Sequence, residues 1–297
     1  MAIVTFLVKM KIRSPATVYM LNLATADVLF VSVLPFLVVY RFSGNNWLFG
    51  EGMCRFVTAT FYCNMYCSIL LMTSISVDRF LAVIYPVRSL PWRTVKRAWL
   101  VCGVIWVISL AGAVPLLLAR QTFFIYDLNA TTCYDVQDTE DLRGFYFYFF
   151  TSLLSLFFFL PLAVTTFCYV RTIRSLSAMN TNRTRKRSRA VYLAAIVLCV
   201  FVLCFGPTNV LHLIYYLQMY EFADDSLYDA YLLSSTICSF SCCLDPLIYF
   251  FASSQCQRCV YSLLRRKKMN LPPGGQHSVL TGHEEYTHVT YSREETC

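Results

Sequence analysis

The chain has 297 residues, of which 57% are hydrophobic and only 14% are charged, and its formal net charge is +8. Its mean hydropathy is +0.54, whereas a soluble domain carries about 25% charged residues. This composition excludes an ordinary soluble protein and predicts an integral membrane protein. The long apolar stretches, which do not alternate strictly with polar residues, favour helices over a β-barrel.

Six apolar stretches are long enough to cross a bilayer core of about 30 Å, at about 1.5 Å per helical residue. A shorter apolar segment, residues 1–8, comes first and is too short to cross. No small-residue cleavage site follows it, so we predict no cleavable signal peptide. The predicted spans are residues 15–42, 54–85, 98–118, 145–172, 190–217 and 227–251.

The basic residues orient these spans. Of the 25 lysines and arginines, 20 fall in four segments, residues 9–13, 79–97, 171–189 and 258–268. The positive-inside rule places these segments in the cytoplasm, and the C-terminus with them. We expect this multi-pass protein in the plasma membrane. We interpret the basic segments as sites for anionic membrane lipid or an acidic protein partner, and not for nucleic acid.

The first predicted span carries Asp27, an acid within the membrane. Such a residue is costly there and indicates a functional site. A hydrogen bond that only packs helices together is the alternative. The second span begins at Cys54, on the outer side, and ends at the inner pair Asp78 and Arg79.

The longest outer loop, residues 119–144, contains Cys133 and the sequon Asn129-Ala130-Thr131. Cys54 and Cys133 are the only cysteines that this topology places on the oxidising side, so we predict a disulfide between them, with two free thiols as the alternative. Asn129 is the predicted glycosylation site.

The last two spans each contain a proline within the apolar run. Pro207 follows Phe205-Gly206, and Pro246 follows a second intramembrane acid, Asp245. A proline removes one backbone hydrogen bond, so we expect both helices to kink at these residues.

Residues 252–268 predict a short amphipathic helix on the inner surface, in which Cys256 and Cys259 are candidates for palmitoylation, with plain thiols as the alternative. Residues 269–297 turn polar and predict a disordered cytoplasmic tail. Its serines and threonines are candidate kinase sites that would recruit arrestin, with a generic polar tail as the alternative.

Together these features resemble the rhodopsin-like (class A) G-protein-coupled receptors. The resemblance implies an all-α seven-helix membrane bundle, and its motifs lie on successive predicted helices. They are Leu23…Ala26-Asp27, Cys54 with Cys133, Asp78-Arg79-Phe80, Trp106, Pro161 with Tyr169, Phe201…Cys204-Phe205-Gly206-Pro207 and Asp245-Pro246…Tyr249.

Three further runs resemble the protease-activated receptors, the family of the thrombin receptor. These runs are residues 61–66, 131–136 and 205–210, and Tyr134 stands where that family usually has a histidine. The resemblance implies that a serine protease cuts the extracellular N-terminus, that the new end binds as a tethered peptide agonist, and that a heterotrimeric G protein is then activated. A role in blood coagulation is implied in the same way.

By matching positions, the resemblance assigns an outer ligand pocket. Ten acidic residues against four arginines in the outer loops suit a cationic peptide. The alternative for the tyrosines is the aromatic belt at the membrane interface. The assigned pocket residues are Tyr62, Asp135, Tyr215, Tyr216, Tyr228 and Tyr231.

The inner half carries the implied activation switch. Arg79 is expected to pair with Asp78 at rest and to be freed on activation. Oxygen ligands suit hard cations, so Asp27, Ser68 and Asp245 are candidates to hold a structural sodium ion, and we expect no other cofactor. The remaining switch residues are Tyr169, Phe201, Phe205, Pro207, Pro246 and Tyr249.

The resemblance also implies a long extracellular N-terminus and a complete first helix. We interpret residues 1–8 as the remnant of that helix and residues 9–251 as helices 2–7 with their loops. A truncated, non-signalling decoy or dimer partner is therefore an alternative function. A transporter is disfavoured because the halves show no repeat, and an enzyme because no metal or catalytic constellation appears.

Overall fold

A computed structural model describes residues 14–126, 129–133, 147–178, 184–218, 225–252 and residue 257. The predicted first-helix remnant and the polar tail lie outside these ranges, as does nearly all of the amphipathic segment 252–268. Palmitoylation of Cys256 and Cys259 therefore stays a prediction.

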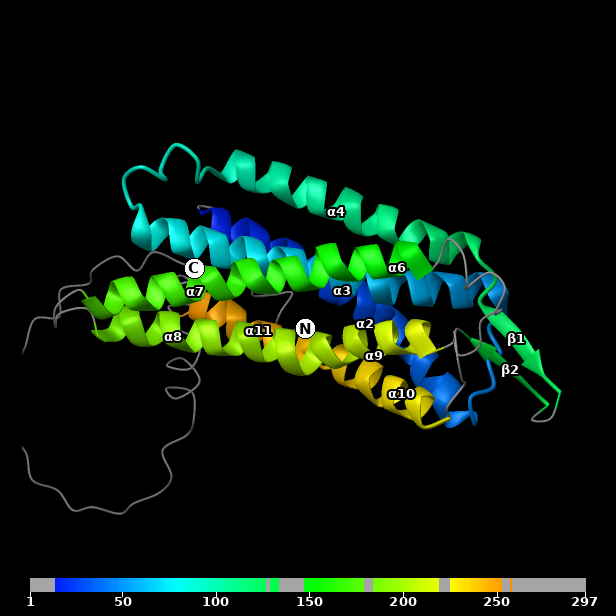
Figure 1. Cartoon of the computed structure of the whole chain (residues 1–297). Helices are drawn as coiled ribbons and strands as arrows, with labels where there is room; N and C mark the ends of the chain where they lie inside the picture. Colours follow the sequence, from blue (N-terminus) through cyan, green and yellow to red (C-terminus); the bar gives the residue numbers. More distant parts are fainter. Residues whose placement is uncertain are drawn as a thin grey trace, which may run out of the picture.

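The described part of the chain is a bundle of long helices with a small sheet at one end (Figure 1). Six helical segments within it are long and apolar enough to cross a membrane, so the all-α membrane fold is confirmed. The elements are α2 (Pro15–Phe42), α3 (Gly50–Ile84), α4 (Val95–Leu118), β1 (Thr122–Ile125), β2 (Ala130–Cys133), α6 (Phe147–Leu154), η2 (Ser155–Phe159), α7 (Leu160–Ala178), α8 (Thr184–Cys199), η3 (Val200–Phe205), α9 (Gly206–Gln218), α10 (Asp225–Ser239) and α11 (Ser241–Ala252).

Two of the helices, α2 (Pro15–Phe42) and α4 (Val95–Leu118), begin at residues whose side chains cap them. Ser14 accepts a hydrogen bond from the Thr17 N–H at 3.4 Å, with Pro15 in the first helical turn. Thr94 caps α4 in the same way, accepting from the Arg97 N–H at 3.3 Å. Capping lets a helix start in polar surroundings, so α4 begins before the apolar run does.

Helix α3 is the centre of the bundle and packs against α2, α4 and α7. Its middle part is buried on more than one side, as the fully buried Ile69, Leu71 and Ile75 show. A partly buried hydrogen bond from Trp106 Nε1 to Asn22 Oδ1, at 3.0 Å, ties α4 to α2. Because α3 packs against three neighbouring helices, a movement of any of them changes its contacts with α3.

Two prolines, Pro161 and Pro207, follow π-helical turns, and at Pro207 we had expected a kink. The turn η2 precedes Pro161 and η3 precedes Pro207. At the end of η3 the Gly206 N–H bonds the Phe201 carbonyl, five residues back. The wider turn accommodates a proline that cannot bond to the fourth residue before it.

The last span is broken, but not at its proline. Helix α10 ends at Ser239 and α11 begins at Ser241. A tight turn joins them, in which the Phe240 N–H bonds the Ile237 carbonyl at 3.0 Å. Pro246 lies inside α11, so Asp245 falls in the first turns of that helix, and the kink expected at Pro246 stays a prediction.

The long outer loop contains a short element of regular structure. Strands β1 and β2 form an antiparallel hairpin, in which Thr122 lies opposite Cys133 and Ile125 opposite Ala130. The hairpin projects from the end of the bundle where α3 begins (Figure 1). We call this end the hairpin end, and the opposite end, which carries Asp78 and Arg79, the basic end.

Candidate functional site

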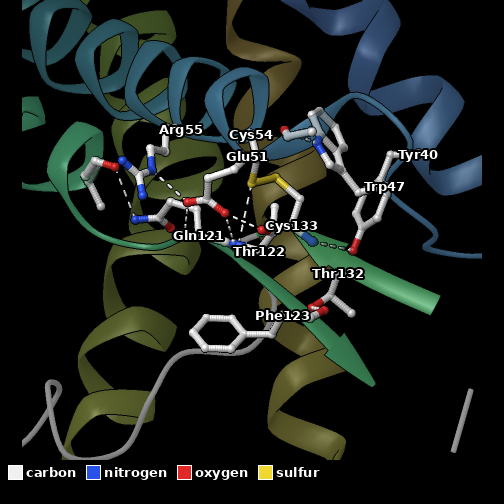
Figure 2. Close-up of a disulfide and its surroundings, with 12 residues drawn as sticks. Tyr40, Trp47, Glu51, Cys54, Arg55, Gln121, Thr122, Phe123, Thr132 and Cys133 are labelled. Atoms are coloured by element: carbon white, nitrogen blue, oxygen red, sulfur yellow. Dashed lines mark hydrogen bonds and ion pairs between the residues drawn. A yellow bond between two sulfur atoms is a disulfide. The ribbon is translucent and has the colours of Figure 1, made fainter. Parts of the chain in front are cut away.

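The hairpin end is organised around the predicted disulfide. Cys54, in the first turn of α3, is bonded to Cys133 at the end of β2, and their Cα atoms lie 5.7 Å apart. Figure 2 shows the bond beside the rings of Tyr40 and Trp47. These residues form a small apolar core with Phe30, so the disulfide lies in a packed setting and the alternative of two free thiols is excluded.

Strand β2 is also held by the connection between α2 and α3. The Trp47 N–H donates to the Thr131 carbonyl at 2.7 Å. The Cys133 N–H donates to the hydroxyl of Tyr40 at 3.2 Å. At the far end of the hairpin Asn129 is exposed, in the left-handed backbone region (φ 46°). That position leaves its side chain accessible for the predicted glycan.

The predicted ligand pocket is only partly described. The Tyr62 side chain is 2% exposed and its ring packs against Phe61 at 5.3 Å between centroids. Four other tyrosines lie on helices whose side chains at these positions are not described, and Asp135 lies outside the described residues. The pocket assignment therefore stays a prediction. The four are Tyr215 and Tyr216 on α9, and Tyr228 and Tyr231 on α10.

At the basic end, Asp78 carries two partners instead of the one we expected. Arg79 Nη2 lies 3.0 Å from Asp78 Oδ2. Arg93, which follows in the loop before α4, donates from Nε to Oδ1 at 2.8 Å and from Nη2 to Oδ2 at 3.1 Å. The Asp78 side chain is only 5% exposed. A buried carboxylate between two guanidinium groups can keep one partner when it loses the other.

Three other predicted switch residues lie in the core of the bundle. Tyr169 is buried, and its hydroxyl has no hydrogen-bond partner among the described residues. Phe201 and Phe205 of η3 are fully buried, and Phe201 stacks on Phe158 of η2 at 6.5 Å between centroids. The two π-helical turns are therefore in direct contact.

Buried acids occupy the middle of the bundle. The Tyr249 hydroxyl donates to Asp27 Oδ2 at 3.0 Å. Asp245 is fully buried and lies close enough to Asp27 for the two carboxyl groups to interact. Within the described residues, the second oxygen of Asp27, the Ser68 hydroxyl and both Asp245 oxygens have no hydrogen-bond partner. Buried oxygens without donors can accommodate a bound cation.

No group of three or more His, Cys, Asp or Glu side chains in the described ranges is arranged to hold a metal ion. Asp27, Asp245 and Ser68 include only two acidic side chains, fewer than such a group. We therefore keep sodium as the only metal ion proposed for them.

Comparison with known proteins assigns the fold to a family. Residues 1–249 match the model of the family described as 7 transmembrane receptor (rhodopsin family). The chain belongs to this receptor family. Its order of helices, the disulfide from the start of α3 and the Asp-Arg pair at the end of that helix all fit the assignment.

Several curated relatives of this receptor carry one name. The chain is 60% identical to Proteinase-activated receptor 1 of Xenopus laevis over 92% of its length, and this alignment covers 64% of the relative. It is 55% identical to Proteinase-activated receptor 1 of Homo sapiens, again over 92% of the chain and 64% of the relative. It is 41% identical to Proteinase-activated receptor 3 of Rattus norvegicus over 78% of the chain and 62% of the relative.

The receptor chain thus spans about 64% of the length of the first two of these relatives. The relatives are named as receptors and not as enzymes, which agrees with the absence of a catalytic constellation in the sequence. The resemblance to protease-activated receptors, based on short runs of residues, is extended by these identities to most of the chain.

Proposed function

We propose that this receptor is of the protease-activated type and signals through heterotrimeric G proteins after a tethered or free peptide agonist binds at its hairpin end. The observation that carries the proposal is the 52–60% identity to seven relatives named Proteinase-activated receptor 1, with 64% of the Xenopus laevis relative covered. The full mechanism would also require a serine protease that releases the tethered peptide.

The proposed orientation places the hairpin end outside the cell. A disulfide and an exposed Asn129 suit an oxidising, glycosylating compartment. The basic end, with its arginines, would then face the cytoplasm, anionic lipid and the G protein. The cytoplasmic tail would recruit arrestin.

The proposed signal passes through elements that can adopt two arrangements. Release of Arg79 from Asp78 at the basic end would accompany movement of α8 about the η3 turn and Pro207. Phe201 and Phe158 transmit that movement to the neighbouring helix, since their rings are stacked. The cavity opened at the basic end would receive the G protein.

A sodium ion is proposed as a stabiliser of the resting state. Asp27, Ser68 and Asp245 offer the buried oxygens without donors that would hold it. The ion would supply positive charge that offsets two neighbouring carboxylates. To test this, the melting temperature of the purified receptor is measured in sodium chloride and in choline chloride. We expect a higher value in sodium that Ser68→Ala removes; equal values for the unaltered receptor would contradict the proposal.

Calcium mobilisation tests the proposed function. Cells expressing the chain receive a synthetic cationic peptide of the tethered-ligand type, and surface receptor is counted in parallel by antibody labelling. We expect a concentration-dependent calcium signal that is absent from untransfected cells. Arg79→Ala, which leaves the hairpin end untouched, should abolish the signal at equal surface expression.

A receptor that reaches the surface and binds the labelled peptide without any signal would support the alternative, a non-signalling decoy or dimer partner. Absence of both binding and signal at full surface expression would contradict the peptide-receptor assignment itself.

A further inference from the structure

Glu51, in the first turn of α3, accepts four hydrogen bonds from within the chain. Its Oε1 accepts from the Gln121 N–H at 2.8 Å and from Arg55 Nε at 2.6 Å. Its Oε2 accepts from the Thr122 N–H at 3.0 Å and also from the Thr122 hydroxyl. Figure 2 shows these bonds converging on the root of β1, beside the disulfide.

The position of these contacts in the hairpin is as informative as their number. Thr122 lies directly opposite Cys133 in the strand register. Glu51 and Cys54 are three residues apart in α3, so their side chains leave the same face of the helix. One turn of α3 therefore holds both strands at a single pair of opposed residues, β2 through a covalent bond and β1 through a carboxylate.

We propose that Glu51 is a second, non-covalent anchor of the hairpin and a positioning residue for the peptide agonist, acting in parallel with the Cys54–Cys133 disulfide. The part concerning the agonist rests on the proposed function; the anchor itself does not. Either attachment alone keeps the hairpin root on α3, so the root stays in place when the disulfide is reduced.

The chemistry of the site requires a carboxylate. Near the N-terminus of a helix a negative charge is favoured by the helix dipole. A carboxylate also has two oxygens for the two backbone N–H groups at Gln121 and Thr122, whereas an amide has one. Both oxygens of Glu51 are occupied within the chain, so Glu51 does not belong to the acids that would attract a cationic peptide.

Hydrogen–deuterium exchange of the purified receptor tests the anchor directly. Charge-assisted hydrogen bonds of this kind contribute about 1.5 kcal/mol or more, so we expect exchange in the peptide covering residues 119–126 to be about tenfold faster in Glu51→Ala. Thr122→Val removes only the hydroxyl donor and should give a smaller increase. In the Glu51→Ala background it should add nothing further.

Thr132→Val is the matched control. It removes one hydroxyl from the opposite strand, a donor to the Phe123 carbonyl at 3.1 Å, and leaves the contact with α3 intact. We expect no change at residues 119–122 in this variant. Unchanged exchange at these residues in both Glu51→Ala and Thr122→Val would overturn the proposal without requiring a disulfide-free protein.

To test whether the two anchors act in parallel, hydrogen–deuterium exchange is measured again after the disulfide is reduced with a phosphine under mild conditions. This test does not depend on the folding of a cysteine variant. The unaltered receptor should keep most of its protection at the root of β1. Glu51→Ala should lose it, and its loss should exceed the sum of the two separate effects. An effect of reduction that is the same with and without Glu51 would refute two parallel anchors.

Agonist response tests the positioning role. In Glu51→Ala we expect the peptide concentration for half-maximal calcium signal to rise about tenfold, with an unchanged maximum per surface receptor. Glu51→Gln, which keeps one acceptor, should lie between. A lowered maximum with unchanged potency would contradict positioning. If the unaltered receptor ignores the peptide, the proposed function fails, while the exchange experiment still decides whether Glu51 is an anchor.

Discussion

Arg93 provides the sharpest prediction at the basic end, because its effect has an unexpected sign. Arg79 and Arg93 share Asp78, whose side chain is 5% exposed. In the proposed activation step Arg79 would leave Asp78, and Arg93 would still balance the buried carboxylate. In Arg93→Gln, release of Arg79 would leave that carboxylate without a cation, which is strongly unfavourable. We therefore expect Arg93→Gln to stabilise the resting state and weaken signalling, although it removes an ionic contact.

The magnitude follows from the geometry. Arg93 makes two charged hydrogen bonds, at 2.8 and 3.1 Å, and such bonds contribute about 1.5–3 kcal/mol in buried settings. The Arg93 side chain is 18% exposed, so screening by solvent favours the lower value. About 1.5 kcal/mol moves the equilibrium between resting and active receptor about tenfold toward rest.

The assay is a concentration–response curve for G-protein activation, normalised to surface receptor, with agonist-free signalling recorded as well. We expect Arg93→Gln to need about tenfold more peptide. Arg97→Gln is the control, since Arg97 lies nearby but bonds the Pro91 carbonyl and stacks on Trp92. Asp78→Asn should act in the opposite direction and raise agonist-free signalling. A rise in agonist-free signalling with Arg93→Gln would refute the reasoning.

Three further outcomes are expected. Replacing both Cys54 and Cys133, which are 79 residues apart, with alanine removes the disulfide. We expect the free energy of unfolding to fall by about 4 kcal/mol in the chain-entropy treatment, and surface expression to fall sharply. Normal expression and an unchanged melting temperature would contradict this. Gly206→Ala should lower the melting temperature by several degrees, since its Cβ would lie 3.3 Å from a backbone carbonyl, whereas Gly103→Ala, with nothing within 4 Å, should not. Asn129→Gln should abolish a mobility shift on glycosidase treatment; an unchanged shift would place the glycan elsewhere.

The lengths of the apolar runs were enough to predict the helical spans. A helix that crosses a bilayer needs such a run, whichever of its faces packs against the other helices. These lengths could not predict where the helices end. Helix α3 starts at Gly50 and not at Cys54, since a helix continues past the lipid wherever capping and packing allow. The disulfide was predictable for a different reason: topology left only one pair of cysteines in an oxidising environment.

Other features depended on contacts between distant residues. Arg93 looked like one more basic residue of an inner loop, and its bond to Asp78 is set by how residues 85–94 fold back on α3. The hairpin did have a local signal, since the β-prone residues at 122–125 and 131–132 flank the residues Asp-Leu-Asn, which are rare in strands. Glu51 is one of the ten acids of the outer loops that the sequence suggested would attract a cationic peptide. A sequence does not reveal which carboxylates already accept hydrogen bonds within the chain.

The π-helical turns bear on how this chain tolerates deletions. Each turn contains one residue more than an α-helix would use for the same turn. Deleting a residue from η2 or η3 would restore regular winding and leave the helix beyond it in about its present orientation. Deleting a residue from the regular stretch between Leu160 and Tyr169 would instead rotate Tyr169 by about 100° and turn it out of the core. The same one-residue loss is thus a milder event within either π-helical turn than in the regular helix that follows it.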